Sequence, residues 1–100
     1  MSENILAIDV GTQSCRASVV TAGGEIVGIA QIAHEVDSPQ PGWAQQRPDQ
    51  WWDETTRAIT QVLGETGTAA ESIAAVSTCG QMHGPVGLDK DGNITNDVEF

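Results

Sequence analysis

One carboxylate and the polar turn after it are the residues of this chain best suited to chemistry. Asp9 follows the apolar residues 5–8, and the chain then turns through Gly11 into the segment Thr12-Gln13-Ser14. Four successive apolar residues predict a strand that is buried on both faces. A carboxylate at the end of such a strand costs free energy unless it is paired, and a hydrated metal ion is a suitable partner. The sequence therefore predicts magnesium-nucleotide chemistry at this strand end.

The turn itself has the composition of a phosphate-binding loop. Gly11 permits a tight turn and a close approach of the backbone to a ligand. The hydroxyl, amide and main-chain N–H groups of Thr12, Gln13 and Ser14 can donate to phosphate oxygens. This pattern resembles the first phosphate loop of the actin, hexokinase and heat-shock-chaperone ATPase superfamily, whose fold is ribonuclease-H-like, and the sequence holds no Walker motif. These residues alone leave open an ordinary β-hairpin with a solvated aspartate.

A second polar segment follows an apolar run at residues 73–79, which predicts a buried strand. This segment, Gly80-Gln81-Met82-His83-Gly84, stands beyond a strand end, where α/β sheets place their ligands. Gln81 and His83 suit the hydroxyl groups of a sugar, and Met82 would supply an adaptable apolar wall. On spacing alone, a structural or surface role for His83 is the alternative.

The three tryptophans lie close together in the sequence. Trp43 stands beside Pro41-Gly42 in a loop, where its indole would either line a sugar site or pack the loop. Trp52 is expected to pack in the core at the start of a helix. Arg47, which precedes that helix, is a weak helix cap.

The histidines and cysteines predict no metal centre. His34 and His83 share no metal-ligand spacing with each other or with Cys15 and Cys79. Both cysteines stand in apolar runs, so we expect buried free thiols in a reducing compartment, and hence a cytoplasmic protein.

Hydrophobic patterning predicts the elements that would position these residues. The expected strands are Asn4 to Val10, Cys15 to Thr21, Glu25 to about Asp37, Ile73 to Cys79, and Pro85 to Leu88. A helix is expected from Pro48 to Gly64 or Gly67, with a core-facing stripe of Trp52, Thr55, Ile59, Val62 and Leu63. A turn is expected at residues 89–93. The order β-β-β-α-β predicts an α/β fold with a mixed sheet, the opening of a ribonuclease-H-like domain.

Charge and length narrow the classes of function. The formal net charge is −10, from 14 acidic and 4 basic residues, which argues against nucleic acid or an anionic membrane surface as a partner. No run approaches the roughly 20 apolar residues that span a bilayer, and the start has no basic and apolar leader. Ordering 100 residues costs on the order of 100 kcal/mol, so a sheet lacking its covering layers would be marginal. We therefore expect a fragment, incomplete at its C-terminal side.

Three segments together resemble the N-terminal part of the FGGY carbohydrate kinases. They are Ala7-Ile8-Asp9-Val10-Gly11-Thr12-Gln13-Ser14, then Pro41-Gly42-Trp43-Ala44-Gln45-Gln46 with Trp51-Trp52, and then Gly80-Gln81-Met82-His83-Gly84 with Leu88-Asp89. The last segment is most similar to the xylulokinase branch, which typically carries G-Q-M-H-G here, whereas glycerol kinases carry Q-R-E. The resemblance implies that residues 1–100 are the N-terminal part of the first of two ribonuclease-H-like domains.

The resemblance also implies roles for individual residues. Asp9 would position the magnesium ion of ATP through water, and Arg16 would lie near the phosphates. Phosphates would bind at Gly11, Thr12 and Gln13; the sugar would contact Gln81, Met82 and His83, with Trp43 close by. The family's catalytic base and adenosine site would lie beyond residue 100.

The function implied for the full-length protein is transfer of the ATP γ-phosphoryl group to a hydroxyl of a ketose. D-xylulose, giving D-xylulose 5-phosphate, is the expected substrate, with ribulose, another ketose or a polyol as alternatives. We expect a homodimer with ATP and Mg²⁺ as cofactors, and an inactive 100-residue chain. A non-catalytic sugar- or nucleotide-sensing module, or an inert folding or oligomerising unit, is the competing interpretation.

Overall fold

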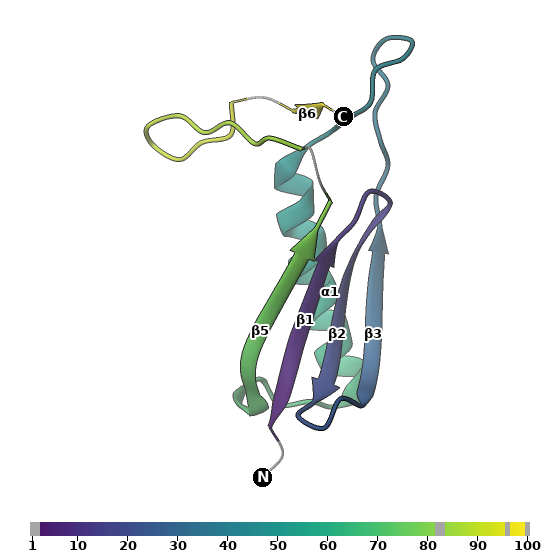
Figure 1. The fold of residues 1–100 in the computed structure, drawn as a ribbon, viewed down its shortest axis with the longest axis vertical. Helices are drawn as coiled ribbons and strands as arrows, with labels where there is room; N and C mark the ends of the chain where they lie inside the picture. Colours follow the sequence, from purple (N-terminus) through teal and green to yellow (C-terminus); the bar gives the residue numbers. More distant parts are fainter. Residues whose placement is uncertain (1–2, 82–83, 96, 100) are drawn as a thin grey trace.

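A four-stranded mixed sheet with one long helix on one face forms the body of the molecule (Figure 1). The computed structural model describes residues 3–81, 84–95 and 97–99. The sheet has the order β3-β2-β1-β5 and comprises β1 (Asn4–Val10), β2 (Ser14–Thr21), β3 (Ile26–Ala33) and β5 (Ile73–Gly80). β1 pairs antiparallel with β2 and parallel with β5. The remaining elements are the helix α1 (Pro48–Thr66), a 3₁₀ turn η1 (Ala70–Ser72), and a small sheet of β4 (Gln45–Gln46) and β6 (Val98–Glu99). The α/β fold predicted from the sequence is confirmed.

The helix α1 starts and stops where the sequence indicates. Pro48 occupies the first turn, and Arg47 caps the helix without a side-chain hydrogen bond, as expected of a weak cap. Gly67 adopts the left-handed conformation with φ of 66°, which closes the helix C-terminus. The helix packs on the sheet through a small apolar core: Leu6, Ala17, Val19, Ala30, Ala58 and Val62.

The predicted core stripe of α1 is wrong at its first member. Trp52 is 73% exposed, whereas Thr55 and Val62 are buried. The buried face instead begins with the half-buried Trp51 and continues through Thr55 and Ala58 to Val62. At about 100° per residue, two adjacent tryptophans cannot both face the sheet, and Trp51 is the one whose ring nitrogen has a buried partner.

Two of the expected strands differ from the observed ones. β3 ends at Ala33 and not near Asp37. Its neighbour in the sheet, β2, begins at Ser14, which pairs with Ala33. Residues after Ala33 therefore have no further residue of β2 to pair with. Asp37 forms only an isolated bridge to Gln45. The strand expected from Pro85 to Leu88 is reduced to a single bridge between Leu88 and Ile94.

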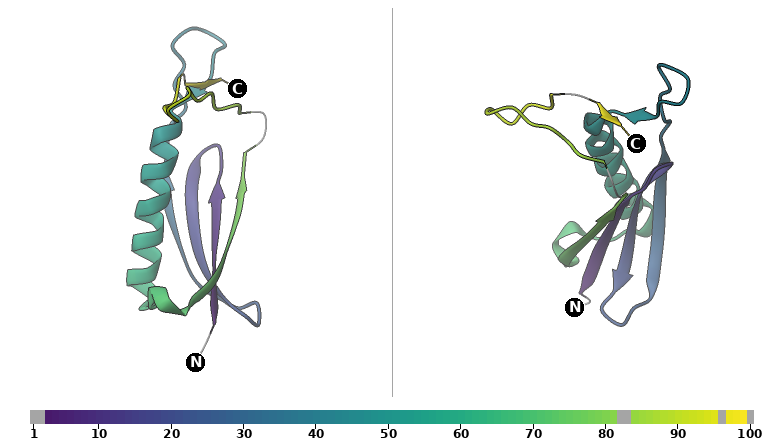
Figure 2. Two further views of the ribbon diagram at one scale, coloured as in Figure 1. Left: turned by 90° about the vertical axis from the view of Figure 1, so that its left-hand side faces the viewer. Right: turned by 45° about the horizontal axis from the view of Figure 1, so that its top comes forward.

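The turn expected at residues 89–93 is confirmed. The Asp89 N–H donates to the Asn93 carbonyl at 2.8 Å, and the Asp89 carboxylate accepts from the N–H groups of Asp91 and Asn93 at 2.9 Å. Hydrogen bonds from the backbone, that of Asn93 above all, lower the pKa of Asp89. These hydrogen bonds close the turn of the hairpin-like loop that projects from the body in Figure 2.

The sheet is covered on one face only within the part of the chain that the structure describes. Figure 2 shows α1 along one side of the sheet and no helix on the other. β1 was expected to be buried on both faces, but only Leu6, which points to α1, is fully buried in it. For the same reason Cys79 on β5 is exposed, contrary to expectation, whereas Cys15 is buried as expected, and both thiols are free. No helix in the described part of the chain is long and apolar enough to cross a membrane.

Candidate functional site

Asp9 lies near the end of β1, on the sheet face that α1 does not cover. Its neighbour Ile8 packs against the core on the helix side of the sheet. Because side chains alternate along a strand, Asp9 points to the opposite face. One carboxylate oxygen, Oδ2, lies 3.5 Å from Nη2 of Arg16, which is opposite Asp9 in the antiparallel register. The side chains of Asp9 and Arg16 are 38% and 50% exposed, so this ion pair is weak and open to solvent. The carboxylate is therefore accessible to a ligand.

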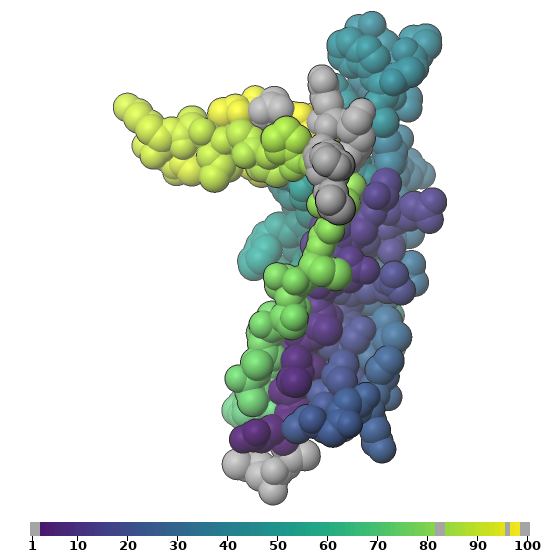
Figure 3. All heavy atoms as spheres, in the orientation of Figure 1, coloured from purple at the N-terminus to yellow at the C-terminus, as the bar shows by residue number. Residues whose placement is uncertain are grey.

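The thiol of Cys79 completes this small polar group. Cys79 faces Asp9 across the parallel β1–β5 pair, and its Sγ donates to Oδ1 of Asp9 at 3.3 Å. The hydrogen bond to the Asp9 carboxylate is the main reason why the pKa of the Cys79 thiol is raised. A hollow of about 280 Å³ lies around these groups, between Ser18 of β2 and Ser77 of β5. Figure 3 views this face, with β5 and β1 side by side at the surface.

The turn between β1 and β2 is held by its own backbone and by the backbone of His34, directly after β3. The Gly11 N–H donates to the Ser14 carbonyl at 2.9 Å, and this bond closes the turn. The Gln13 carbonyl accepts from the N–H of His34 at 2.9 Å. Thr12 and Gln13 themselves are exposed, so the tip of the loop is presented to solvent while its base is held.

A chain of side-chain amides connects this loop with the segment after β5. Nε2 of Gln46 donates to the Thr12 carbonyl at 2.6 Å, and Oε1 of Gln46 accepts from Nε1 of Trp51 at 2.8 Å. The same Oε1 accepts from Nε2 of Gln81 at 2.9 Å, and Oε1 of Gln81 accepts from Oγ1 of Thr12 at 3.3 Å. The N–H of Gln81 also donates to the Val10 carbonyl at 2.8 Å. The turn between β1 and β2 and Gln81 are thus one hydrogen-bonded unit, and Thr12 and Gln81 are 69 residues apart in the sequence.

Sequence reasoning missed the role of Gln46 in this unit. Its side chain is almost completely buried, with 2% of the residue exposed. A glutamine in a polar run between a loop and a helix gives no local sign that it will be buried.

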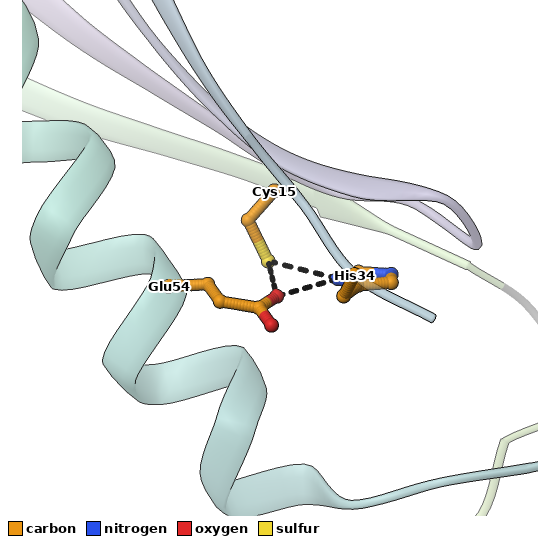
Figure 4. Close-up of side chains that lie close together, drawn as sticks. All are labelled: Cys15, His34 and Glu54. Atoms are coloured by element: carbon orange, nitrogen blue, oxygen red, sulfur yellow. Dashed lines mark hydrogen bonds and ion pairs between the residues drawn. The ribbon is translucent and has the colours of Figure 1, made fainter. Parts of the chain in front are cut away.

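A buried group of three polar side chains, Cys15, His34 and Glu54, lies between the sheet and α1 (Figure 4). Nδ1 of His34 is 2.6 Å from Oε2 of Glu54, and Nε2 of His34 is 2.8 Å from the Gly11 carbonyl oxygen. Sγ of Cys15 lies 3.7 Å from the same Oε2 and 3.9 Å from Nδ1. Burial is the main cause that raises the pKa of the Cys15 thiol. Spacing along the sequence predicted no metal-ligand relation between His34 and Cys15, and it missed this group because the members come from β2, the residue after β3 and α1.

A cleft of about 540 Å³ opens between the start of α1 and the C-terminal ends of β1 and β5. Its wall is mostly apolar and includes Val10, Trp51 and Trp52, with Gln81 and Gly84 at one side. The exposed indole of Trp52 is thus part of a cleft wall and not of the core.

Comparison with known proteins identifies the family of this chain. A model of the N-terminal domain of the FGGY family of carbohydrate kinases matches residues 4–98. The chain belongs to this family.

Relatives of this FGGY chain include glycerol kinases. That of Leifsonia xyli subsp. xyli is 38% identical over 91 residues, which are 91% of this chain and 18% of the relative. The glycerol kinase of Thermococcus gammatolerans is 32% identical over 92 residues, covering 92% of this chain and 19% of the relative. The chain therefore spans about a fifth of the length of the curated relatives it matches.

Similar solved structures include xylulose kinases. A xylulose kinase from Rhodospirillum rubrum superposes with a TM-score of 0.90 at 26% identity, covering 97% of this chain and 20% of that one. A kinase from Brucella ovis, described as a xyloylose kinase, has a TM-score of 0.88 at 29% identity, with coverage of 93% and 20%. Glycerol kinase from Plasmodium falciparum, solved with ADP, has a TM-score of 0.81 at 18% identity and shows the same fold.

The structure brings together only some of the residues that the FGGY resemblance assigns to the site. Asp9 pairs with Arg16, and Thr12 contacts Gln81. Trp43 lies in the loop of residues 38–44, which projects beyond the sheet (Figure 1), and it is 46% exposed. Its N–H donates to the Gln40 carbonyl at 3.0 Å, and it is not among the residues that line the cleft. Met82 and His83 lie outside the described residues, so their roles stay predictions.

Proposed function

We propose that this chain is the N-terminal part of the first domain of an ATP-dependent carbohydrate kinase. The observation that carries the proposal is the position of Asp9, a solvent-accessible carboxylate at the end of a central strand, next to a turn whose base is hydrogen-bonded from two sides. The match of residues 4–98 to the FGGY N-terminal domain supports it.

The residues present fit a hydrated magnesium ion. Magnesium prefers hard oxygen ligands, keeps several of its waters and is usually bound through one or two carboxylates plus substrate phosphates. Asp9 offers such a carboxylate on an open face, and Ser18 and Ser77 line the same hollow. When bound, the ion supplies neutralising charge for the ATP phosphates.

The loop of Gly11, Thr12 and Gln13 is proposed to bind phosphate oxygens. Its exposed tip offers hydroxyl, amide and backbone donors, and its braced base means that little conformational entropy is lost when phosphate binds. Arg16, half exposed beside Asp9, adds a positive charge on the same face. Positioning and charge neutralisation provide most of the acceleration in phosphoryl transfer, and these groups do both.

The substrate is proposed to be a ketose of the D-xylulose type. The segment Gln81-Met82-His83 and the likeness to solved xylulose kinases at 26% and 29% identity support this choice. Gln81 is proposed to orient a hydroxyl of the sugar, and the hydrogen bonds that fix its amide to Thr12 and Gln46 support this role. The general base that accepts the proton of the sugar hydroxyl is proposed to come from outside residues 1–100.

Glycerol is the second candidate substrate. It is favoured by the glycerol kinases among the relatives, which are 32% to 38% identical to this chain. Glycerol lacks the carbonyl group of a ketose and is shorter than D-xylulose. Discrimination between the two substrates would therefore rest on the polar contacts that the pocket makes along the substrate.

Release of ADP by the full-length parent protein with a substrate panel tests both candidates. The panel holds D-xylulose, D-ribulose, gluconate and glycerol, each with ATP and Mg²⁺. We expect the highest kcat/KM with D-xylulose. A higher value with glycerol selects the second candidate, and binding of a sugar without any ADP release would point to a sensing module and contradict the kinase proposal.

A further inference from the structure

Three potential metal ligands meet in the interior, on the opposite side of the sheet from Asp9. Cys15 stands at the start of β2, His34 directly follows β3, and Glu54 lies in the second turn of α1 (Figure 4). Cys15 is completely buried, and the side chains of His34 and Glu54 are 2% and 10% exposed. Because Cys15 and Arg16 are successive residues of a strand, the cluster and the Asp9–Arg16 pair face opposite ways.

We propose that Cys15, His34 and Glu54 form a binding site for one zinc-class transition-metal ion. A thiolate, an imidazole and a carboxylate are the ligand types that zinc takes in proteins, whereas magnesium and calcium prefer oxygen alone. The soft sulfur selects against the magnesium ion that serves ATP. This site thus differs in its ligands and its chemistry from the proposed nucleotide site, to which the His34–Gly11 hydrogen bond connects it, and it does not depend on the proposed kinase reaction.

The ligand atoms already have nearly the separations that such an ion requires. Usual zinc bond lengths in a tetrahedron place sulfur about 3.6 Å from a nitrogen or oxygen ligand, and nitrogen about 3.4 Å from oxygen. Sγ of Cys15 lies 3.9 Å from Nδ1 of His34 and 3.7 Å from Oε2 of Glu54. The third separation, Nδ1 to Oε2, is 2.6 Å because a shared proton joins these two atoms. A metal ion that replaces this proton widens the pair by less than about 1 Å, within reach of a glutamate side chain.

The second nitrogen of His34 is fixed in the manner of a metal-ligating histidine. A carbonyl oxygen can only accept, so Nε2, 2.8 Å from the Gly11 carbonyl oxygen, must carry the hydrogen. This hydrogen bond sets the ring orientation and directs Nδ1 toward Cys15 and Glu54. Metal-ligating histidines donate their other N–H to a carbonyl or carboxylate in the same way.

Metal binding would tie three elements to the phosphate loop. On binding, the thiol proton of Cys15 and the proton between His34 and Glu54 leave to solvent, and the ion links β2, the end of β3 and α1. The Trp51 carbonyl oxygen, 3.8 Å from the sulfur, is the candidate for a fourth ligand. Through the His34–Gly11 hydrogen bond, the ion would stiffen the base of the loop.

Cobalt and zinc binding to the full-length parent protein tests the proposal. After removal of metal by a chelator, Co²⁺ is added, and the thiolate-to-cobalt charge-transfer band and the tetrahedral d–d bands are recorded. Zinc content is then measured by mass spectrometry after dialysis. The ligand variants are Cys15→Ser, His34→Gln and Glu54→Gln. Cys79→Ser is the matched control, because it removes the other cysteine, which is exposed and outside the cluster.

The expected result is one Co²⁺ or Zn²⁺ per chain in the wild type, with a thiolate band that Cys15→Ser abolishes and Cys79→Ser leaves unchanged. Each ligand variant is expected to weaken zinc binding by about tenfold or more. No thiolate band in the wild-type protein would overturn the proposal without recourse to any variant, and the cluster would then be a hydrogen-bonded group only. A band lost in Cys79→Ser and kept in Cys15→Ser would overturn it as well. Circular dichroism of each variant separates loss of binding from loss of folding.

Discussion

His34 holds the carbonyl oxygen of Gly11 at 2.8 Å through Nε2, and so connects the phosphate loop to the interior of the protein. Its other nitrogen is 2.6 Å from Glu54 on α1. A glycine at position 11 gives the turn more conformational freedom than another residue would, and the His34 side chain restrains it.

We expect His34→Phe to destabilise the protein measurably. The ring volume is kept, but the half-buried Gly11 carbonyl and the buried Glu54 carboxylate both lose this partner, at about 1–3 kcal/mol for a fully buried group and less for Gly11. The midpoint of thermal unfolding should fall accordingly. His34→Gln, which can donate to one of the two partners, should recover part of the loss. Equal midpoints for His34→Phe and the wild type would contradict a bracing role.

Gly28 of β3 lies close to the side chain of Thr66 at the end of α1. A Cβ atom at this position would clash with Cγ2 of Thr66. We expect Gly28→Ala to cost about 1–3 kcal/mol of unfolding free energy, because overpacking forces β3 and α1 apart.

Gly64→Ala is the matched control for this prediction. Gly64 lies in α1 with open space around its Cβ position, so alanine there should stabilise the helix by up to about 1 kcal/mol. Urea unfolding of both variants measures the difference. If Gly28→Ala is as well tolerated as Gly64→Ala, the close packing of β3 on α1 is not as described.

Gln46 is expected to be critical for ATP binding although it would not touch ATP. Gln46→Glu keeps the shape and the acceptor for Trp51, but removes the N–H that donates to the Thr12 carbonyl at 2.6 Å. The proposed phosphate loop then loses one of its braces, and in the full-length parent protein the KM for ATP should rise more than the KM for the sugar. Gln50→Glu, an equal change at an exposed position of α1, is the control. Identical KM values in both variants would rule out the brace.

The reactivity of Cys79 should report on the Asp9 carboxylate. Hydrogen bonding to Asp9 raises the pKa of Cys79, so less thiolate is present at a given pH, and alkylation by iodoacetamide at pH near 8 should be slow. Asp9→Asn removes the negative charge, lowers that pKa and should speed alkylation several-fold. Cys15, buried and with a raised pKa of its own, should stay unmodified in both proteins. Mass spectrometry of the labelled chain measures both rates, and an unchanged Cys79 rate would contradict the contact.

Local sequence patterns predicted the elements of the fold but not how they bury polar groups. The strand of residues 4–10 and the helix that starts at Pro48 were predictable, because alternation, proline and glycine act within a few residues. Trp52 was misplaced because hydrophobicity alone does not say which of two adjacent tryptophans faces the sheet. The burial of His34 and Glu54 depends on contacts across 20 residues, which no local pattern contains.

The candidate site was predictable to a similar degree. The acidic strand end and the polar turn make Asp9 and Thr12 candidates by type and spacing, although these residues alone leave open an ordinary β-hairpin, and their roles stay predictions. That Gln81 contacts Thr12 follows from the parallel pairing of β1 and β5, which places both strand ends at one edge of the sheet. The exposure of Cys79 was missed because an apolar run predicts a strand without saying whether both of its faces are covered.

The most direct test of the account is the activity of Asp9→Asn in the full-length parent protein, measured together with its affinity for sugar. Because Asp9 is proposed to hold the hydrated magnesium ion of ATP, kcat should fall by about 100-fold or more, while the dissociation constant of the sugar, measured by calorimetry, should stay near that of the wild type. Asp49→Asn, which changes an exposed carboxylate at the start of α1, should leave both quantities unaltered. Loss of sugar binding with turnover per bound sugar preserved in Asp9→Asn would contradict the role given to this residue.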